Sequence, residues 1–450
     1  MQVKIDNIDD QFPYFPFNIE RLDGSNQYLI KNHLIDDSLR LNRQAVEVLR
    51  LLNGEISLSE IMLQLAKGYP ESGGLENIRA KIIPLLLLLT DKELIWWRDI
   101  PLKLVPVGPP PSIFWEITAA CNLQCRHCVV SAGPKLAGEL KTKRCLELAE
   151  EMTDFGLESV AFSGGEPFLH PDFAKIAERV RELGLTVQVA TNGTLITSKE
   201  ANWLKEIQAG VQVSLDGSNS KTHDYMRPGH NAFDRTIAGI KALVETGQDV
   251  TVGTVLSSIN IDDINNIISL AQELGVAHFR LIPFVPKGRG EHYTHLEVPP
   301  KKVEKVTKHL YKLRNEVAIS IADLEFEEMI GGNVCPEHLD LSQPLGCSGA
   351  VSYGTITPVG ELLPCHFFEG VRADSIVNTS FGEVWRRSRF LNYFRHLNIG
   401  DLKGVCNNCS WLPKCGGSCR AVNFAKGDLF GPNLSCWIAE ELKGDLDYER

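Results

Sequence analysis

The sequence predicts an α/β protein whose central part is a partial (β/α)6 barrel, flanked by a smaller domain at each end. Three observations lead to this prediction. From Ile113 onward, short β-branched runs alternate with amphipathic helical stretches, and this alternation is typical of a parallel sheet with helical crossovers. The first hundred residues instead suggest strands followed by three helices. After about residue 330 the apolar periodicity fades, and loops, glycines and cysteines dominate.

Length, charge and hydropathy restrict the class of protein. A chain of 450 residues is long enough for two or three domains. The net charge of −11 argues against a nucleic-acid partner, because such proteins carry a basic surface, and against docking on anionic lipid. The N-terminus lacks the pattern of a secretory signal, and the apolar run "IIPLLLLLT" is too short to span a bilayer. We therefore expect a cytoplasmic protein with no membrane or nucleic-acid partner.

Residues 1–100 predict a separate α+β domain with a winged-helix-like order of elements. "NQYLIKN" alternates as a strand does, and "NRQAVEVLRLLNG" spaces its apolar residues as a helix does, up to Gly54. Ser57 and Glu60 have the spacing of a capping box for a second helix. A third helix over residues 75–89 leads to a closing strand in "KELIWWRD". The proline-rich "PLKLVPVGPPPS" then forms a linker.

Residues 101–330 contain the six predicted strand–helix units. The strand segments are "IFWEIT", "SVAFSG", "TVQVAT", "VQVSLDG", "DVTVGTVL" and "HFRLIPF". In barrels of parallel strands the chemistry lies at the C-terminal strand ends. A cysteine loop follows the first strand, "SGGEP" the second, "TNGT" the third and "LDG" the fourth. We therefore expect these segments to meet in one site.

The twelve cysteines are unevenly distributed, with four between residues 121 and 145 and eight from residue 335 onward. In a reducing compartment such clusters are more typical of metal ligands than of disulfides. In the first group, Cys121, Cys125 and Cys128 have C-x3-C-x2-C spacing. Three thiolates can hold three irons of a [4Fe–4S] cubane and leave one iron open for chemistry. The alternative is a zinc site completed by His127 or by a distant residue.

This motif resembles the signature of the radical S-adenosylmethionine (SAM) superfamily, C-x3-C-x-Φ-C, with His127 at the position Φ that is usually aromatic. The resemblance implies that the open iron binds SAM, and that reductive cleavage of SAM yields a 5′-deoxyadenosyl radical that abstracts a substrate hydrogen. "SGGEP" resembles the family's GGE motif, whose glutamate pairs with the SAM ammonium, and "SLDG" resembles its ribose-binding strand end. Arg227 and Arg280 are either carboxylate contacts or structural residues. The SAM-binding residues implied in this way are His127, Ser163, Gly164, Gly165, Glu166, Asn192, Ser214, Asp216, Arg227 and Arg280.

The C-terminal cysteines resemble the SPASM extension of radical SAM enzymes, which holds two auxiliary [4Fe–4S] clusters. The resemblance assigns Cys406, Cys409, Cys415 and Cys436 to a distal cluster and Cys347, Cys365 and Cys419 to a proximal one. Cys335 is the candidate for a fourth proximal ligand, but it lies twelve residues before Cys347, so the proximal cluster is either complete or open. Two zinc knuckles are the alternative.

Cys145 and His366 are two further candidate residues. Cys145 lies within a helical stretch and is better explained as a buried structural thiol. His366 follows Cys365 directly, where some relatives have an aspartate that acts as a base. A catalytic base and a histidine without a chemical role are both consistent with its position.

The N-terminal domain resembles the PqqD-like element that binds leader peptides by strand addition; a DNA-reading winged helix is the alternative, and the acidic charge disfavours it. We therefore predict a radical SAM/SPASM enzyme that crosslinks or oxidises a ribosomally made precursor peptide. Its cofactors are SAM and three [4Fe–4S] clusters, and its partners are the leader-bearing peptide and an electron donor such as flavodoxin or ferredoxin. Alternatives are a non-peptide substrate such as a tetrapyrrole, another protein as substrate, or a non-catalytic metal-binding sensor.

Overall fold

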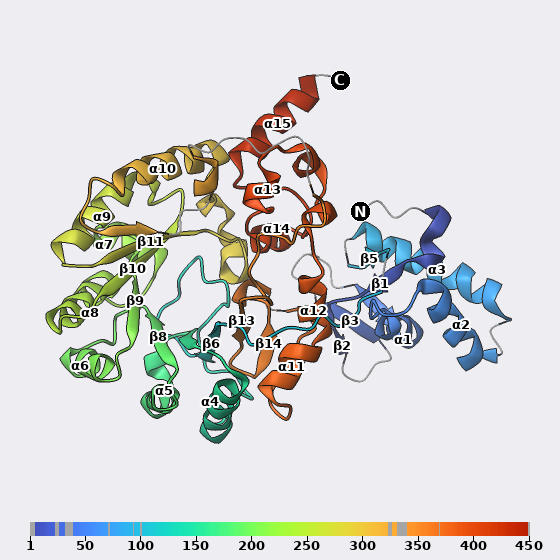
Figure 1. Ribbon diagram of the computed structural model, residues 1–450, viewed down its shortest axis with the longest axis horizontal. Coiled ribbons are helices and arrows are strands. Elements are labelled where there is room, and N and C mark those ends of the chain that lie inside the picture. Colours follow the sequence, from blue (N-terminus) through green and yellow to red (C-terminus); the bar gives the residue numbers. More distant parts are fainter. Residues whose placement is uncertain are drawn as a thin grey trace.

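The computed structural model describes residues 5–22, 27–31, 39–70, 73–92, 94–99, 101–322, 326–330, 340–368 and 370–448. Figure 1 shows three regions in chain order: a small N-terminal region, a barrel ringed by helices, and a C-terminal region between them. None of the described helices combines the length and the apolar character needed to cross a bilayer.

The N-terminal region is an α+β unit, as predicted. Its elements are β1 (Phe12–Tyr14), β2 (Asn18–Arg21), β3 (Gln27–Lys31), β4 (Arg40–Asn42), α1 (Arg43–Leu51), α2 (Leu58–Gly68), α3 (Leu75–Asp91) and β5 (Trp96–Arg98). Strands β2, β3 and β4 form one antiparallel sheet, and β1 pairs with β5. The predicted capping box is confirmed, because Ser57 accepts from the Glu60 amide while Glu60 accepts from the Ser57 amide.

The barrel contains the six predicted strands, each followed by the expected crossover. Its elements are β6 (Ser112–Thr118), α4 (Thr142–Phe155), β7 (Ser159–Gly164), α5 (Phe173–Glu182), β8 (Thr186–Thr191), α6 (Ser198–Glu206), β9 (Gly210–Ser214), α7 (Ser220–Met226), α8 (Ala232–Glu245), β10 (Val250–Leu256), α9 (Ile264–Glu273), β11 (His278–Pro283), α10 (Pro300–Leu313) and β12 (Ser320–Ala322). The short β12 is a seventh parallel strand, paired with β11, that the sequence analysis did not include.

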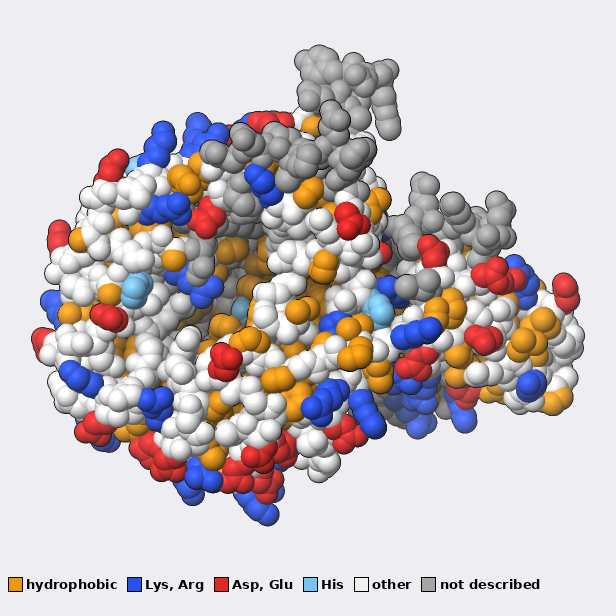
Figure 2. Space-filling model, in the orientation of Figure 1, with side chains coloured by type: hydrophobic (Ala, Val, Ile, Leu, Met, Phe, Trp, Pro, Cys, Tyr) orange, Lys and Arg blue, Asp and Glu red, His pale blue; other side chains and the backbone are white. Residues whose placement is uncertain are grey.

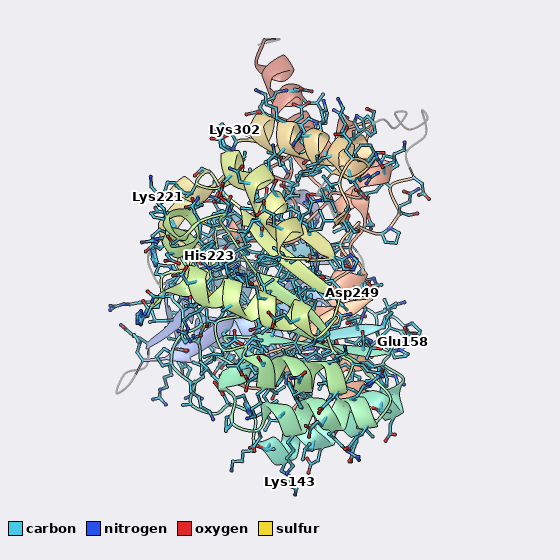
Figure 3. The ribbon with its side chains drawn as sticks, turned by 90° about the vertical axis from the view of Figure 1, so that its left-hand side faces the viewer. Lys143, Glu158, Lys221, His223, Asp249 and Lys302 are labelled. Atoms are coloured by element: carbon cyan, nitrogen blue, oxygen red, sulfur yellow. The ribbon has the colours of Figure 1, made fainter. Side chains whose placement is uncertain are left out.

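Helices cover the outer face of this sheet because each carries one apolar stripe. In α5 the buried residues Phe173, Ile176, Ala177 and Val180 recur at helical spacing. Between the sheet and this helical layer, Trp115 and Phe162 stack with ring centroids 5.6 Å apart, and Phe162 also packs edge-on against Phe173 of α5. Viewed from the barrel side, charged residues such as Lys143, Lys221 and Lys302 lie at the periphery of the helical layer (Figure 3).

The C-terminal region continues the barrel sheet. Its elements are β13 (Tyr353–Ile356), β14 (Glu361–Leu363), β15 (Asp374–Ser375), α11 (Phe381–Arg387), α12 (Arg389–Arg395), α13 (Leu412–Cys415), α14 (Arg420–Ala425) and α15 (Trp437–Tyr448). Strand β13 pairs in parallel with β6, and β14 and β15 follow as antiparallel edge strands. The ten-stranded order is β12-β11-β10-β9-β8-β7-β6-β13-β14-β15. The first barrel strand is therefore shared between the barrel and the C-terminal region.

The N-terminal region lies against the C-terminal region (Figure 1), and aromatic rings form part of the contact. Tyr14 stacks on Tyr393 with centroids 5.0 Å apart, and Trp96 lies 4.9 Å from the same ring. An ion pair between Glu55 and Arg389 adds a polar contact of 2.9 Å. Buried aromatic pairs of this kind contribute about 0.5–1.5 kcal/mol each beyond their area burial.

Candidate active site

A cavity of about 830 Å³ lies between the C-terminal ends of the barrel strands and the C-terminal region. Figure 2 shows this face of the molecule hollowed at that place. The predicted site residues among its lining residues are Cys121, Cys125, His127, Cys128, Ser163, Gly164, Gly165, Asn192, Ser214, Arg227, Arg280, His366 and Cys419. Segments that the sequence places at four different strand ends therefore meet around one space.

The three-cysteine loop after β6 is fixed by backbone hydrogen bonds at both ends. The Cys121 amide donates to Gly133 O at 2.8 Å, and the Gly133 amide returns a bond to Ala119 O at 3.0 Å. Arg289 clamps the middle, since its Nε donates to Cys125 O at 2.9 Å and its Nη1 to Ala132 O at 2.6 Å. Arg289 was not among the residues predicted from the sequence, where its position between two glycines in "KGRG" is the only local signal.

Each of the three sulfurs accepts an N–H hydrogen bond. The donors are the Leu123 amide to Cys121 at 3.5 Å, the Ala132 amide to Cys128 at 3.3 Å, and Arg227 Nη1 to Cys125 at 3.7 Å. Such bonds stabilise the thiolate form and tune iron–sulfur clusters. This donor set fits a cluster held by three thiolates.

Burial makes two of the thiols in this loop, those of Cys125 and Cys121, weaker acids. It raises the pKa of Cys125 to about 12 and also raises the pKa of Cys121, and the charges of the neighbouring thiolates add to both effects. Without a metal these thiols stay protonated at neutral pH, so metal binding must release their protons. Because the charge of one cysteine raises the pKa of another, the three sulfurs must lie close together.

Three buried polar side chains, those of Asp216, Arg227 and His127, lie next to the loop. Arg227 Nε donates to Asp216 Oδ2 at 2.6 Å, and His127 Nε2 lies 3.4 Å from the same oxygen. Burial lowers the pKa of His127 to about 4 and that of His223 to about 4, so both imidazoles are neutral near pH 7. The Arg227 guanidinium lowers the pKa of Asp216 against the effect of its burial. The result is one buried ion pair flanked by two neutral imidazoles.

Asp216 does not line the cavity; both its carboxylate oxygens have protein partners. Oδ1 accepts from the Val255 amide at 2.8 Å, and Oδ2 takes the Arg227 contact. Its direct contact with the SAM ribose, inferred from the resemblance, stays a prediction. Ser214, at the end of β9, does line the cavity.

The "SGGEP" turn packs against the start of the cysteine loop. A Cβ on Gly165 would lie 2.1 Å from Ala120 O, and one on Gly164 would lie 2.4 Å from Thr118 O. Gly164 also has a φ of +118°, a region that favours glycine. The Gly165 amide donates to Thr118 O at 2.7 Å. Only glycine allows this close approach of two strand ends.

Glu166 is completely buried next to this turn and ties β7 to β8. Its carboxylate accepts from Thr191 Oγ1 at 2.8 Å and from the Asn192 amide at 2.9 Å. Burial nevertheless raises its pKa to about 7. Contact between Glu166 and the SAM ammonium stays a prediction.

Asn192 connects the end of β8 to the cysteine loop. Its Nδ2 donates to Asn122 Oδ1 at 2.9 Å, and Asn122 Nδ2 donates to Thr194 Oγ1 at 2.8 Å. Asn122 and Thr194 were not selected from the sequence, because neither residue type marks a chemical role by itself. They hold Asn192 at the cavity wall.

The opposite wall of the cavity belongs to the C-terminal region. Here the rings of Tyr353 and His366 both lie against Phe114, at 6.0 and 5.8 Å. The Tyr353 hydroxyl is hydrogen-bonded to Cys365, and burial is the main reason that its pKa is raised. Burial, with the charges of Arg280 and Lys287, lowers the pKa of His366 to about 4. His366 is therefore neutral near pH 7, and its role as a base stays a prediction.

The C-terminal cysteines form two groups. The charges of Cys347 and Cys419 raise the pKa of Cys365 beyond the effect of burial, which shows that these three cysteines lie near one another. The second group is identified in the same way from Cys415, whose neighbours are Cys436, Cys406 and Cys409. These are the proximal and distal sets expected from the SPASM resemblance. Cys335 lies outside the described residues.

Cys145 stands apart from these groups. It is 1% exposed in α4, where it packs in the hydrophobic core. Burial raises its pKa to about 12, which is the behaviour of an inert structural thiol.

Comparisons with known proteins agree with this site. Residues 115–271 match the model of the radical SAM superfamily, and residues 347–410 match SPASM, an iron–sulfur cluster-binding domain. An AdoMet-dependent heme synthase of Methanosarcina barkeri is 33% identical over 343 residues, which cover 73% of this chain and 96% of that protein. The mycofactocin maturase MftC of Mycobacterium tuberculosis is 29% identical over 346 residues, covering 73% and 83%.

Similarity of fold extends over more of the chain. The crystal structure of Streptococcus suis SuiB bound to precursor peptide SuiA superimposes with a TM-score of 0.62 over 95% of this chain and 99% of that one, at 15% identity. Enzymatic relatives remove the alternative of a non-catalytic sensor. The three-thiolate loop, the cavity beside it and these relatives agree: the chain belongs to the radical SAM superfamily and is an enzyme with a SPASM domain that uses SAM and iron–sulfur clusters.

Proposed function

We propose that this enzyme modifies a ribosomally made precursor peptide, abstracting a hydrogen atom from one of its residues to install a thioether, carbon–carbon or carbon–oxygen crosslink or a similar oxidation. The observation that carries the proposal is the N-terminal region with its small open sheet, docked on the same C-terminal region that forms one wall of the cavity. A small-molecule reaction in the cavity gives this region no task.

The sheet β2-β3-β4 has two edge strands, β2 and β4. Edge strands present backbone groups that an extended peptide can pair with. Just before β2, Phe17 forms a bridge with Val371 of the C-terminal region. A leader strand added beside β2 would therefore leave the sheet next to the region that contributes Tyr353 and His366 to the cavity. The shared fold with SuiB, which was solved with its precursor peptide, supports this assignment.

We assign residues 1–100 to leader recognition, residues 101–330 to the radical SAM barrel and residues 331–450 to the SPASM domain. Cys121, Cys125 and Cys128 would hold the cluster that binds SAM. When bound, that cluster supplies the electron for reductive cleavage of SAM. The chain's own residues then have separate tasks: Arg227 and the Leu123 and Ala132 amides stabilise the thiolates, and Ser163, Asn192, Ser214 and Arg280 line the space for SAM and substrate.

Two auxiliary clusters would bring the total to three. Cys419 lines the cavity itself, so the proximal cluster would lie beside the substrate. At this place it would accept the electron left after hydrogen abstraction or hold a substrate thiolate. A flavodoxin or ferredoxin would supply electrons to the cluster that binds SAM.

Anaerobic reconstitution followed by iron and sulfide analysis tests the cluster assignment, with about twelve irons per chain expected (four per cubane). Calorimetry with the short peptide encoded next to the gene, its full length compared with a version lacking the leader, tests the substrate. We expect binding of the full-length peptide alone, together with a mass change in that peptide and release of 5′-deoxyadenosine. Release of 5′-deoxyadenosine without any leader binding would contradict the peptide assignment.

A tetrapyrrole is the second candidate substrate, because the heme synthase relative is 33% identical over most of the chain. In that case a tetrapyrrole, and no peptide, would raise the rate of 5′-deoxyadenosine release. The two substrates tested side by side on one reconstituted preparation separate these functions.

A further inference from the structure

Arg420 is a fully buried cation whose hydrogen-bond partners are all neutral. It is the first residue of α14, directly follows Cys419 and is 0% exposed. Its Nη1 donates to Gly431 O at 2.7 Å and to Leu429 O at 3.2 Å, while Nη2 donates to Gly417 O. Within the described part of the chain, no carboxylate forms an ion pair with it. A buried charge without a counter-charge is costly in free energy.

The cysteines next to Arg420 in the chain and along its hydrogen bonds come from both auxiliary groups. Arg420 directly follows Cys419, and Gly417, whose carbonyl accepts from Arg420 Nη2, donates its own amide to Cys415 Sγ at 3.2 Å. Cys419 belongs to the proximal group, whereas Cys415 belongs to the distal one. The backbone amide of Arg420 also donates to Cys347. The residue therefore contacts or faces both groups.

One part of the guanidinium remains without a protein partner. The Arg420 Nε is buried and makes no hydrogen bond to any described residue. The three carbonyl bonds fix the plane of the guanidinium, so this N–H cannot turn toward another acceptor without breaking them. Buried donors are almost always satisfied in native proteins. The unpartnered donor and the missing counter-charge both indicate an anionic acceptor that the cysteine groups hold.

We propose that Arg420 places its positive charge between the two auxiliary clusters and raises the reduction potential of both. This inference rests on the assignment of both cysteine groups to clusters. A cluster gains a negative charge when it is reduced, and a fixed cation in a poorly hydrated interior stabilises that reduced state. Arg420 acts through the clusters and not on the substrate, so it is a positioning residue for electron transfer.

The test compares Arg420→Gln and Arg420→Lys with the wild type in the full chain, each reconstituted anaerobically and followed by EPR during a redox titration. Gln removes the charge, whereas Lys keeps it without the planar fork. We expect the Gln variant to shift both auxiliary midpoints to more negative potential by at least a tenfold change in the reduction equilibrium, about 59 mV for one electron. The Lys variant should titrate nearer to the wild type, and the cluster that binds SAM should not move.

Arg235→Gln is the matched control, because Arg235 is a partly buried arginine of α8 whose Nη2 also donates to a backbone carbonyl, Thr194 O at 2.9 Å. It should leave every midpoint unchanged. Wild-type midpoints in an iron-replete Arg420→Gln variant would overturn the proposal. Equal loss of iron in the Gln and Lys variants would assign Arg420 a purely structural role and also overturn it.

The titration contains no peptide, so its result does not depend on the substrate. Wild-type iron near four per chain would instead contradict the cluster assignment.

Discussion

Arg227 and Asp216 form a buried ion pair, with Nε and Oδ2 2.6 Å apart, directly behind the three-cysteine loop. Asp216 is 0% exposed and also accepts from the Val255 amide, so it joins the end of β9 to β10. Arg227 reaches Cys125 with its Nη1. The pair therefore links the ends of β9 and β10 to Cys125, a proposed cluster ligand.

Replacing Asp216 by Asn should destabilise the protein strongly. The change leaves Arg227 as a buried cation without its partner, and breaking a buried pair in this way costs about 3–5 kcal/mol. Anaerobic thermal unfolding measures the loss. Glu383→Gln, which breaks the exposed pair with Arg387, should change the midpoint by less than about 1 kcal/mol equivalent. Equal stability of the Asn variant and the wild type would show that solvent or other groups replace the carboxylate.

The contact between the "SGGEP" turn and the cysteine loop gives a second prediction. Gly165→Ala would place a Cβ 2.1 Å from Ala120 O, a backbone atom, so the loop must move. We expect reduced iron at the SAM cluster and weaker SAM binding, measured by iron analysis and equilibrium dialysis. Gly133→Ala is the control in the same loop, because nothing lies within 4 Å of its Cβ position. A Gly165→Ala protein with normal iron and SAM affinity would contradict the close-approach argument.

Glu166 gives a prediction about pH. Burial raises its folded pKa from the usual 4.5 to about 7. Between these two values the folded state holds the proton that the unfolded state has lost, so this contribution to stability is complete below pH 4.5 and disappears as the pH rises through 7. Its slope is at most about 1.4 kcal/mol per pH unit.

Thermal unfolding of cluster-free wild type and Glu166→Gln between about pH 5 and pH 7, the range over which this stabilisation is lost, reveals the contribution. The wild-type midpoint should fall with pH relative to that of the Gln variant. Glu158→Gln alters an exposed carboxyl at the surface (Figure 3) and should follow the wild-type profile. Parallel profiles for wild type and Glu166→Gln would show that the carboxylate is ionised without a penalty.

The parts of the fold that local pattern determines were predictable from the sequence. Six β-branched runs separated by amphipathic helices became β6 to β11, and Ser57 with Glu60 became a capping box. Strand β12 was missed because three residues carry no periodicity. The parallel pairing of β13 with β6 has no local signal at all, since its register joins Tyr353 to Ser112.

The candidate site shows the same limit. The cysteine spacing, the "SGGEP" turn and the strand-end rule were enough to bring the right segments together. The partners of individual side chains were not predictable: the sequence left Arg227 open between a SAM contact and a structural ion pair, and the fold shows that it pairs with Asp216. Arg289 clamps two carbonyls of a loop that lies far from it in the chain, and only the tertiary fold creates that contact.

The docking of the N-terminal region gives the last prediction. Trp96 packs on Tyr393 at 4.9 Å and on Phe390 at 6.3 Å, and it is 6% exposed. Trp96→Ala should cost about 3–5 kcal/mol in this interface and loosen the N-terminal region, so limited proteolysis should cut the linker over residues 101–111 faster. Trp203→Ala is the matched change in the barrel, where Trp203 packs on Phe173 at 5.7 Å; it should leave cleavage of the linker unchanged.

If the N-terminal region binds the leader, Trp96→Ala should also uncouple peptide binding from 5′-deoxyadenosine release while the iron content stays constant. Unchanged linker cleavage in Trp96→Ala would show that this aromatic contact does not hold the two regions together.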